Sequence, residues 1–215
     1  MIKDNLEKIK LQLPLTVQLV AVSKFRPIEQ LREVYDHGVR DFAENRVQEL
    51  CEKQETMPED IQWHMIGHLQ TNKVKYIAPF IHLIHSVDSL DLAKEISKQG
   101  QKLGLKIKVL IQFHIAQEVS KFGFDLNKSE SIFNQIMALP NIEVCGLMGM
   151  ATFTEDTNLI RLEFQKLNIA FNHFKETLFE SSTNFNILSM GMSNDFMLAI
   201  EEGSTLVRIG SKIFE

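Results

Sequence analysis

Eight short apolar runs alternate with amphipathic stretches along the chain, and this alternation limits its possible folds more than any other feature. The runs are VQLVAVSK (17–24), DFAEN (41–45), QWHMIG (62–67), LIHSVD (83–88), KVLIQFHI (108–115), VCGLMGM (144–150), ILSMGM (187–192) and TLVRIGS (205–211). Strands that alternate with helices form parallel βαβ units with right-handed crossovers. Eight is also the number of strands that closes a TIM-type barrel. We therefore predict a single-domain α/β protein, a TIM-type (β/α)8 barrel spanning residues 1–215.

The stretches between the runs have helical patterns. An opening helix is expected over residues 2–12, and DSLDLAKEISKQGQKLG has helical apolar spacing with Gly100 and Gly104 at its end. The sequence stops at Glu215, directly after the eighth run, so we expect the opening helix to cover the missing eighth helix and expect no second β domain. An open doubly wound sheet is the alternative, although no GxGxxG turn follows the first run.

Composition excludes several classes of function. Hydrophobic residues make up 44% of the chain and charged residues 24%, with a formal net charge of −5, so a nucleic-acid partner is not expected. No run approaches the roughly 18 apolar residues of a membrane span, and the charged start MIKDNLEKIK is unlike a signal peptide. Cys51 and Cys145 form no CxxC pair and are expected to be reduced thiols in a cytoplasmic protein.

Lys24 ends the first run and is the leading candidate for a reactive side chain. Alternation through Val20, Val22 and Lys24 puts its ammonium group on the apolar face, at the C-terminal end of the strand. A lysine in apolar surroundings needs a partner or a lowered pKa, and a lowered pKa makes a lysine nucleophilic toward carbonyls. The alternative is a lysine that ends a strand and extends its head into solvent. Pro27 suits the first turn of the next helix.

The ends of the seventh and eighth runs are rich in glycine and serine. Ser193 is placed to cap the helix after the seventh run, and a helix N-terminus attracts anions. Gly210 allows close backbone approach, and Ser211 offers a hydroxyl group. Since barrels often hold phosphate near strands seven and eight, these two ends together indicate a phosphate cup. Each residue taken alone is equally compatible with an ordinary cap or turn.

Two further polar residues are expected at strand ends. Arg208 shares a strand face with Leu206 and is predicted to point into the barrel, where it needs an acceptor. A cofactor ring nitrogen is one candidate acceptor, and a salt bridge with Glu44 or Asp88 is the other. Asn45 ends the second run, where its amide can bind a ligand oxygen or, from spacing alone, cap the next helix.

Histidines fall within three of the central runs. His64, His85 and His114 are interpreted as core residues with satisfied hydrogen bonds, the usual role of dispersed histidines. His64 and His68 have the i,i+4 spacing of a zinc-binding helix, but Gly67 lies between them in a segment typical of a strand followed by a turn. We therefore predict no metal site.

Seven segments resemble one known family. VAVSKFRP, FAENRVQEL, WHMIGHLQTNK, IHSVDS, AQEVSKFGF, LSMGMSNDF and STLVRIGSKIF are similar to segments of the pyridoxal phosphate homeostasis protein family, the proline synthase co-transcribed homologues. This family has the fold-type III barrel related to the alanine racemase N-terminal domain. The resemblance runs from about residue 17 to the end, and it departs from the family pattern at His114, where asparagine is expected.

The resemblance implies pyridoxal 5′-phosphate (PLP) as the cofactor. The implied contacts are a Schiff base at Lys24, phosphate contacts at Ser193, Gly210 and Ser211, a pyridine-nitrogen contact at Arg208, and a ring pocket lined by Asn45 and Met190. An arginine keeps its proton, so it favours an unprotonated pyridine nitrogen and a weak electron sink. The implied function is non-catalytic: a monomeric protein that holds PLP and delivers it to PLP-dependent apoenzymes.

Two catalytic functions are the alternatives. An amino-acid racemase needs a second base opposite Lys24, and racemases of this fold use a tyrosine from an additional domain and a partner subunit. Here the tyrosines are Tyr35 and Tyr76, both in predicted helices, although His64 or Cys145 could substitute in principle. A Schiff-base aldolase would explain the lysine and the phosphate cup but not the family resemblance.

Overall fold

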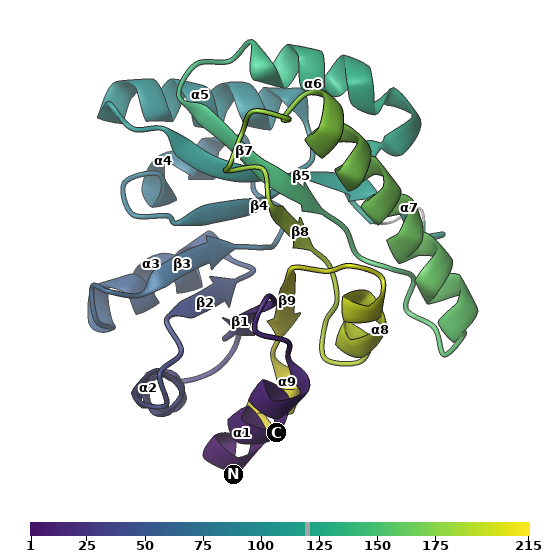
Figure 1. Cartoon of the computed structure of the whole chain (residues 1–215). Helices are drawn as coiled ribbons and strands as arrows, with labels where there is room; N and C mark the ends of the chain where they lie inside the picture. Colours follow the sequence, from purple (N-terminus) through teal and green to yellow (C-terminus); the bar gives the residue numbers. More distant parts are fainter. Residues whose placement is uncertain (119–120) are drawn as a thin grey trace.

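Eight parallel strands close into a barrel in the computed structural model, which describes residues 1–118 and 121–215 (Figure 1). The barrel strands are β1 (Gln18–Val22), β2 (Asp41–Glu44), β3 (Gln62–Met65), β4 (Leu83–Val87), β5 (Ile107–His114), β7 (Ile142–Met148), β8 (Ile187–Ser189) and β9 (Leu206–Ile209). Each pairs in parallel with the next, and β9 pairs with β1 to close the ring. The predicted (β/α)8 barrel is therefore confirmed, and the open doubly wound sheet is excluded.

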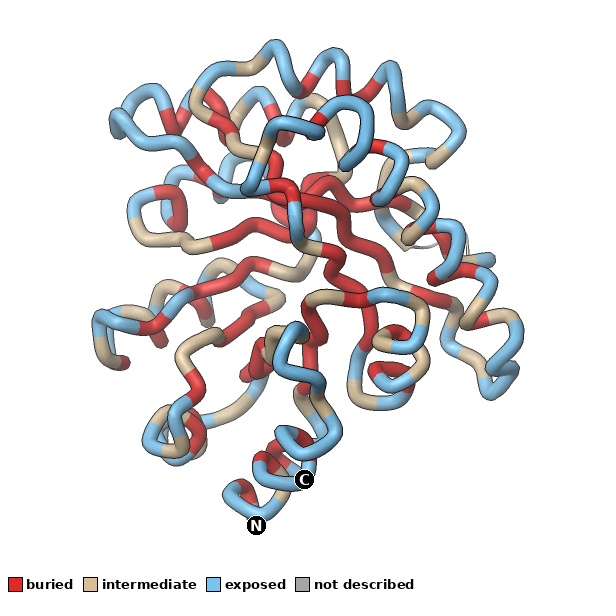
Figure 2. The backbone as a smooth tube through the Cα atoms, viewed as in Figure 1, coloured by how far each residue is buried: buried red, intermediate tan, exposed pale blue. Residues whose placement is uncertain are grey.

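Helices surround the barrel on its outer side (Figure 1). They are α1 (Ile2–Gln12), α2 (Ile28–Asp36), α3 (Val47–Thr56), α4 (Val74–Ile77), α5 (Leu90–Leu103), α6 (Ser129–Met137), α7 (Thr157–Thr177), α8 (Phe196–Glu201) and α9 (Ser211–Phe214), with short 3-10 helices at Thr71–Lys73 and Leu126–Lys128. Figure 2 shows the strands almost continuously buried, while each helix alternates buried and exposed residues. This pattern is typical of parallel strands covered on both faces.

Side chains alternate between the two faces of each barrel strand. Val20, Val22, Ala43 and Leu206 form a small apolar cluster inside the barrel, separate from the large core between the strands and the helices. Ala21 belongs to that outer core, as the two-residue period of a strand requires. The inward face of β1 therefore leads directly toward position 24, as the sequence predicts.

A two-residue strand, β6 (Phe124–Asp125), lies outside the eight predicted runs. It pairs with the end of β5, with Phe113 opposite Phe124. Gly123 precedes it with φ of 137°, and a Cβ at this position would lie 2.5 Å from the backbone nitrogen of His114. The close approach of two backbones explains why glycine stands here. The segment borders the open end of the barrel and is too short to give a strand pattern in the sequence.

The opening helix is confirmed at Ile2–Gln12, and it packs against both α2 and α9. The Nδ2 atom of Asn5 donates a hydrogen bond to the carbonyl of Ile213 at 3.2 Å. The expectation that no helix follows the eighth run was wrong, because the four-residue α9 begins immediately after Gly210. Figure 1 shows α1 and α9 side by side, so the two together cover this part of the barrel.

The helix predicted from DSLDLAKEISKQGQKLG is α5, and its ends differ slightly from the prediction. Ser89 caps its start by accepting a hydrogen bond from the backbone of Leu92, and Gly104 ends it with φ of 67°. Gly100 does not end the helix but lies within it. A Cβ there would lie 2.7 Å from the carbonyl oxygen of Asn141, so this glycine permits close packing and not a turn. Within the described part of the chain, no helix combines the length and the apolar character needed to cross a membrane.

Candidate functional site

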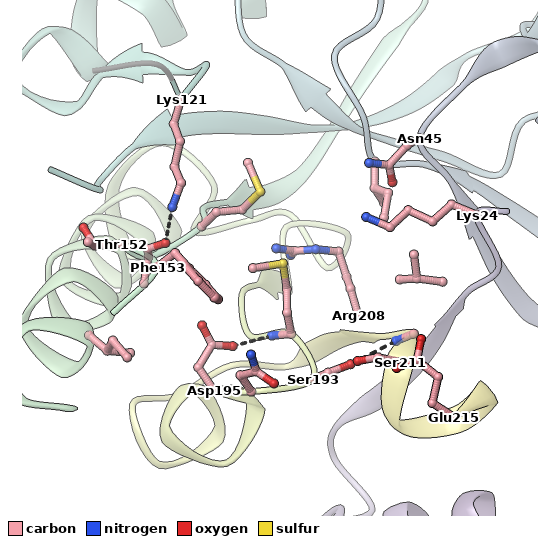
Figure 3. Close-up of a pocket in the computed structure, with 18 of the residues that line it drawn as sticks. Lys24, Asn45, Lys121, Thr152, Phe153, Ser193, Asp195, Arg208, Ser211 and Glu215 are labelled. Atoms are coloured by element: carbon pink, nitrogen blue, oxygen red, sulfur yellow. Dashed lines mark hydrogen bonds between the residues drawn. The ribbon is translucent and has the colours of Figure 1, made fainter. Parts of the chain in front are cut away.

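A pocket of about 640 Å³ opens at the C-terminal ends of the barrel strands (Figure 3). Its volume lies within the range of small-molecule sites, roughly 300–1,000 Å³. The residues that line it come mainly from the C-terminal ends of β1, β2, β7, β8 and β9, and they include Lys24, Asn45, Thr152, Ser193, Arg208 and Ser211. Six of the seven cofactor contacts expected from the sequence line this pocket, namely Lys24, Asn45, Ser193, Arg208, Gly210 and Ser211.

Lys24 lies two residues beyond the end of β1 and lines the pocket together with Val22. The predicted alternation therefore holds past the end of the strand. Figure 3 draws Lys24 beside Asn45, with both side chains directed toward the space that Arg208 also enters. The lysine is exposed and not enclosed by apolar side chains. Of the two surroundings considered for Lys24, enclosure by apolar side chains was thus wrong, and a head group that extends into solvent agrees with the structure, because the pocket opens at the mouth of the barrel.

A buried ion pair lies behind Lys24, on the outer side of the sheet. The Nζ atom of Lys53, from α3, donates to the Oε1 atom of Glu44 at 2.7 Å and to the carbonyl of Ser23 at 2.8 Å. The hydroxyl of Ser23 donates to the same carboxylate oxygen at 2.6 Å. Burial raises the pKa of Glu44, and the hydrogen bonds from Lys53 and Ser23 oppose this rise. The pair connects α3 to the ends of β1 and β2, next to Lys24.

The peptide on the other side of Lys24 is also held by α3. The backbone N–H of Phe25 donates to the Oε2 atom of Glu49 at 2.9 Å. Phe25 has φ of 62°, a left-handed conformation that costs a non-glycine residue about 1–2 kcal/mol. The charge-assisted bond to Glu49 offsets part of this cost. Side chains of α3 therefore fix the backbone on both sides of Lys24.

Arg208 points into the barrel, as predicted, and is 3% exposed. Its Nη1 atom donates to the hydroxyl oxygen of Ser189 at 2.6 Å, and its Nη2 atom donates to the carbonyl of Gly149 at 3.2 Å. Burial lowers the pKa of Arg208 to about 10, and the charge of Asp195 opposes this shift. The remaining guanidinium N–H groups are left for the pocket that the side chain lines.

The predicted alternative for Arg208, a salt bridge with Glu44 or Asp88, was wrong. Glu44 is on the outer face of the sheet and pairs with Lys53. Asp88 pairs with the Nδ1 atom of His68 at 2.7 Å. Both acids thus have other partners. The choice of these partners depends on strand alternation and loop geometry, which sequence spacing alone does not reveal.

The loops after β8 and β9 are joined to each other by a hydrogen bond. The backbone N–H of Gly210 donates to the hydroxyl oxygen of Ser193 at 3.3 Å (Figure 3). A Cβ on Gly210 would lie 3.0 Å from the carbonyl oxygen of Val22, so the close approach to β1 favours glycine here. Ser211 is exposed at the first position of α9. The three residues expected to form a phosphate cup therefore lie together.

Ser193 is not the helix cap that the sequence predicts. Helix α8 begins at Phe196, and the residue before it is Asp195. The Oδ1 atom of Asp195 accepts a hydrogen bond from the backbone of Met192 at 2.6 Å, which closes the turn between β8 and α8. The helix is thus shorter than predicted, and the hydroxyl of Ser193 faces the loop after β9 instead.

Met190 does not line the pocket, contrary to expectation. It is fully buried in the outer core, between the barrel and the helices. Gly191 follows with φ of 94° and turns the chain, and Met192 then lines the pocket while 37% exposed. Only the family resemblance placed Met190 in the pocket. The strand ends at Ser189, whose side chain contacts Arg208 inside the barrel, and the residue that follows it faces outward.

Asn45 lines the pocket with a polar atom that has no internal partner. Its Oδ1 atom is buried and accepts no hydrogen bond from the described residues. Asn45 is not the cap of α3, because Arg46 precedes that helix. A Cβ on Gly67 would lie 2.3 Å from the carbonyl oxygen of Asn45, so the loops after β2 and β3 pack closely here. A buried acceptor without a partner is costly and is expected to meet a ligand.

These features suit a phosphorylated aromatic aldehyde. An amine, a buried guanidinium, an unpaired amide oxygen and two hydroxyl groups converge on one cavity. Among the residues that the structure describes, no group of three or more His, Cys, Asp and Glu side chains is arranged to hold a metal ion.

Comparison with known proteins identifies the family. Residues 1–215 match the profile of the alanine racemase N-terminal domain. The pyridoxal phosphate homeostasis protein of Aquifex aeolicus is 41% identical over 202 residues, which cover 92% of this chain and 86% of that protein. The human pyridoxal phosphate homeostasis protein is 38% identical over 213 residues, which cover 92% of this chain and 75% of that protein. This chain belongs to the pyridoxal phosphate homeostasis protein family.

Solved structures agree with membership in this family. PipY of Synechococcus elongatus without PLP has a TM-score of 0.93 and 33% identity, with all of both chains covered. PipY with PLP bound has a TM-score of 0.89 at the same identity and coverage. Alanine racemase of Clostridium difficile is 16% identical with a TM-score of 0.77, covering 99% of this chain and 55% of that one, and so shares the fold.

Further pocket residues of this family member were missed by the sequence reasoning. Lys121 lies in the segment AQEVSKFGF and donates a hydrogen bond to the carbonyl of Ala151 (Figure 3). Its Nζ atom is 3.1 Å from the Oε1 atom of Glu118, which also accepts a hydrogen bond from the backbone N–H of Phe153 at 2.9 Å. The bond from Phe153 and the charge of Lys121 lower the pKa of Glu118 to about 2. The family resemblance includes the segment AQEVSKFGF, but no strand pattern in the sequence predicted that this segment lies beside the pocket.

We predict that Lys53→Met destabilises the protein by about 3–5 kcal/mol near neutral pH, because Glu44 is left as an uncompensated buried charge. The pKa of Glu44, already raised by burial, rises further once Lys53 is gone. The unfolded chain releases the proton of this carboxyl group near pH 4.3, whereas the folded variant still holds it at higher pH. The loss of stability in the variant therefore grows as the pH rises through the raised pKa, and it shrinks at acid pH. Urea denaturation at several pH values measures this.

The double variant Glu44→Leu/Lys53→Met is the matched control. It removes both charges and is expected to recover most of the lost stability, since apolar pairs often replace buried ion pairs without cost. A single-variant loss under about 1 kcal/mol, or one that grows as pH falls, would contradict the assigned role of the pair.

Proposed function

We propose that this chain is a PLP-binding protein of intracellular PLP homeostasis, which holds the cofactor through a covalent link to Lys24 and delivers it to apoenzymes. The observation that carries the proposal is the convergence of Lys24, Arg208 and the Ser193–Gly210 bond on one pocket. The names of the relatives and the PLP bound in PipY support it. Delivery to PLP-dependent apoenzymes and action as a monomer are parts of the same proposal.

The proposal assigns a role to each end of the pocket. When bound, PLP would supply an aldehyde group, and the Lys24 amine would hold it covalently. The buried guanidinium of Arg208 donates a hydrogen bond toward the ring nitrogen and keeps its own proton there. Ser193 accepts from Gly210 and so retains its hydroxyl proton for a phosphate oxygen, and Ser211 offers a second hydroxyl. Asn45 orients the ring through its amide.

A carrier is favoured over a racemase because the tyrosine expected as the second base of a racemase has no counterpart among the described residues that line the pocket. No tyrosine, histidine or cysteine is among the described residues that line it. The hydroxyl of Tyr35 donates to Asp60 on the outer surface, and Tyr76 is 51% exposed on α4. His64 and Cys145 are buried and do not reach the cavity. The second pocket amine, Lys121, is held by Ala151 and Glu118.

The first test is chemical labelling of the wild-type protein. Incubated with PLP, it should absorb in the visible, and borohydride should fix the cofactor to Lys24, as mapped by peptide mass spectrometry. Lys73 is exposed outside the pocket and serves as the internal control that stays unlabelled. A label mainly on Lys121 or Lys73, or none at all, would show that Lys24 is not the attachment point.

A second prediction separates phosphate contacts from structural roles. Ser193→Ala combined with Ser211→Ala should weaken PLP far more than pyridoxal, which lacks the phosphate. Each lost hydrogen bond to the anion should cost about 1.5–3 kcal/mol, tenfold or more in the dissociation constant. Ser131→Ala, an exposed serine on α6, is the control and should change neither affinity. Equal losses for both ligands would mean that the two serines only shape the loops.

A third prediction is that the protein has no racemase activity of physiological size. A positioned acid or base is typically worth about 10²–10⁴-fold, and this pocket provides one on a single side. Several L-amino acids incubated with stoichiometric holoprotein and analysed by chiral chromatography provide the measurement. Turnover near 10 s⁻¹, roughly the median for enzymes, would favour the racemase instead.

A further inference from the structure

A continuous chain of hydrogen bonds crosses the barrel interior from the pocket to the opposite end. Arg208 Nη1 is 2.6 Å from Ser189 Oγ, and Ser189 Oγ is 3.0 Å from His85 Nδ1. His85 Nε2 is 2.9 Å from His64 Nδ1, and His64 Nε2 is 3.0 Å from Asp41 Oδ1. Ser189, His85 and His64 are fully buried. Asp41 is the first residue of β2, at the end of the barrel away from the pocket.

When each imidazole carries a single proton, the two ends of this chain determine the direction of every bond in it. A guanidinium can only donate, and a carboxylate can only accept. Ser189 therefore accepts from Arg208 and gives its own proton to His85. His85 then donates from Nε2 to His64, which donates from Nε2 to Asp41. Burial holds the pKa of His85 well below its usual value, in accord with a neutral ring in this arrangement.

This direction matters because Ser189 is the partner that orients one arm of the Arg208 guanidinium. A serine hydroxyl rotates freely unless a neighbour requires its proton. His85 requires that proton, so a lone pair of Ser189 stays turned toward Arg208. Hydrogen bonds in such a series also strengthen one another in a low-dielectric interior. At the far end, Gln18 donates to Asp41 at 2.7 Å and fixes the carboxylate in place.

We propose that His85, His64 and Asp41 are positioning residues for Arg208, and that they hold its guanidinium in the orientation that meets the ring nitrogen of PLP. The proposal rests on the proposed function, because the ring nitrogen belongs to PLP. It gives the interior histidines a task beyond filling the core. They act through Ser189 and touch neither the cofactor nor Lys24.

The first experiment compares PLP with 1-deazapyridoxal 5′-phosphate, in which a C–H group replaces the ring nitrogen. His85→Leu should raise the dissociation constant of PLP about three- to tenfold, the effect of one ordinary hydrogen bond, and that of the analogue less than twofold. His85→Asn keeps an acceptor near the Nδ1 position and should restore the wild-type ratio. Equal weakening of both ligands by His85→Leu would overturn the proposal, since only a structural role has that effect.

A double variant tests whether the effect passes through Arg208. In an Arg208→Met background, His85→Leu should no longer change the ratio of the two affinities. A ratio that still changes would mean that His85 acts by another route and would also overturn the proposal.

The second experiment needs no cofactor. Nitrogen-15 NMR of the imidazoles in the ligand-free protein should find His85 and His64 neutral, each protonated on Nε2, and Ser189→Ala should shift the His85 Nδ1 resonance. A proton on Nδ1 of His85 would reverse the chain and overturn the proposal. If the wild-type protein bound neither ligand, the proposed function would fail, whereas the NMR result would still show whether the chain of bonds exists.

Discussion

Pairing of the first barrel strand with the last one determines where the functional residues meet. In the parallel register of β1 and β9, Val20 lies opposite Arg208, although almost the whole sequence separates them. Neighbours in such a register direct their side chains to the same face of the sheet. Lys24 and Arg208 therefore reach the same end of the barrel interior, and the Ser193–Gly210 bond joins the adjacent loops at that end. Without this closure, the pocket would not form.

The barrel keeps its buried charges satisfied by different means on its two faces. On the outer face, Lys53 neutralises Glu44 and also binds the backbone behind Lys24. On the inner face, Arg208 has no such ion pair in the described chain and relies on Ser189 and the carbonyl of Gly149. Burial without partners would cost several kcal/mol in either place. Both arrangements stabilise the fold and also fix the groups that surround the pocket.

The sequence predicts the fold well because its main signals are local. Alternating apolar runs identify all eight barrel strands, and the same alternation directs Lys24 and Arg208 to the inner face. The errors arise where a strand or helix ends. Met190, which the family resemblance placed in the pocket, lies in the outer core instead. Ser193 does not cap α8, because that helix starts later than expected. Loop geometry of this kind depends on tertiary packing, which a linear pattern does not record.

Other features could not be predicted because they join strands that are distant in sequence. The hydrogen bonds between His64, His85 and Ser189 require the register of three separate strands, so spacing could identify the histidines only as core residues. The imidazoles of His64 and His85 are indeed buried, with both ring nitrogens hydrogen-bonded. The third predicted core histidine, His114, is only partly buried, and its Nε2 atom contacts the carbonyl of Glu118. Lys53 gave no signal beyond its place in an amphipathic helix.

The exposure of Lys24 affects how a ligand that is held covalently there, as proposed, can leave. A reactive lysine sealed beneath a lid has to wait for the protein to open before water or another amine can reach the bond. Here the side chain is exposed at the mouth of the cavity, while its backbone is fixed from behind by α3. With a ligand attached to Lys24 as proposed, water or another amine can approach the bond from the mouth of the cavity.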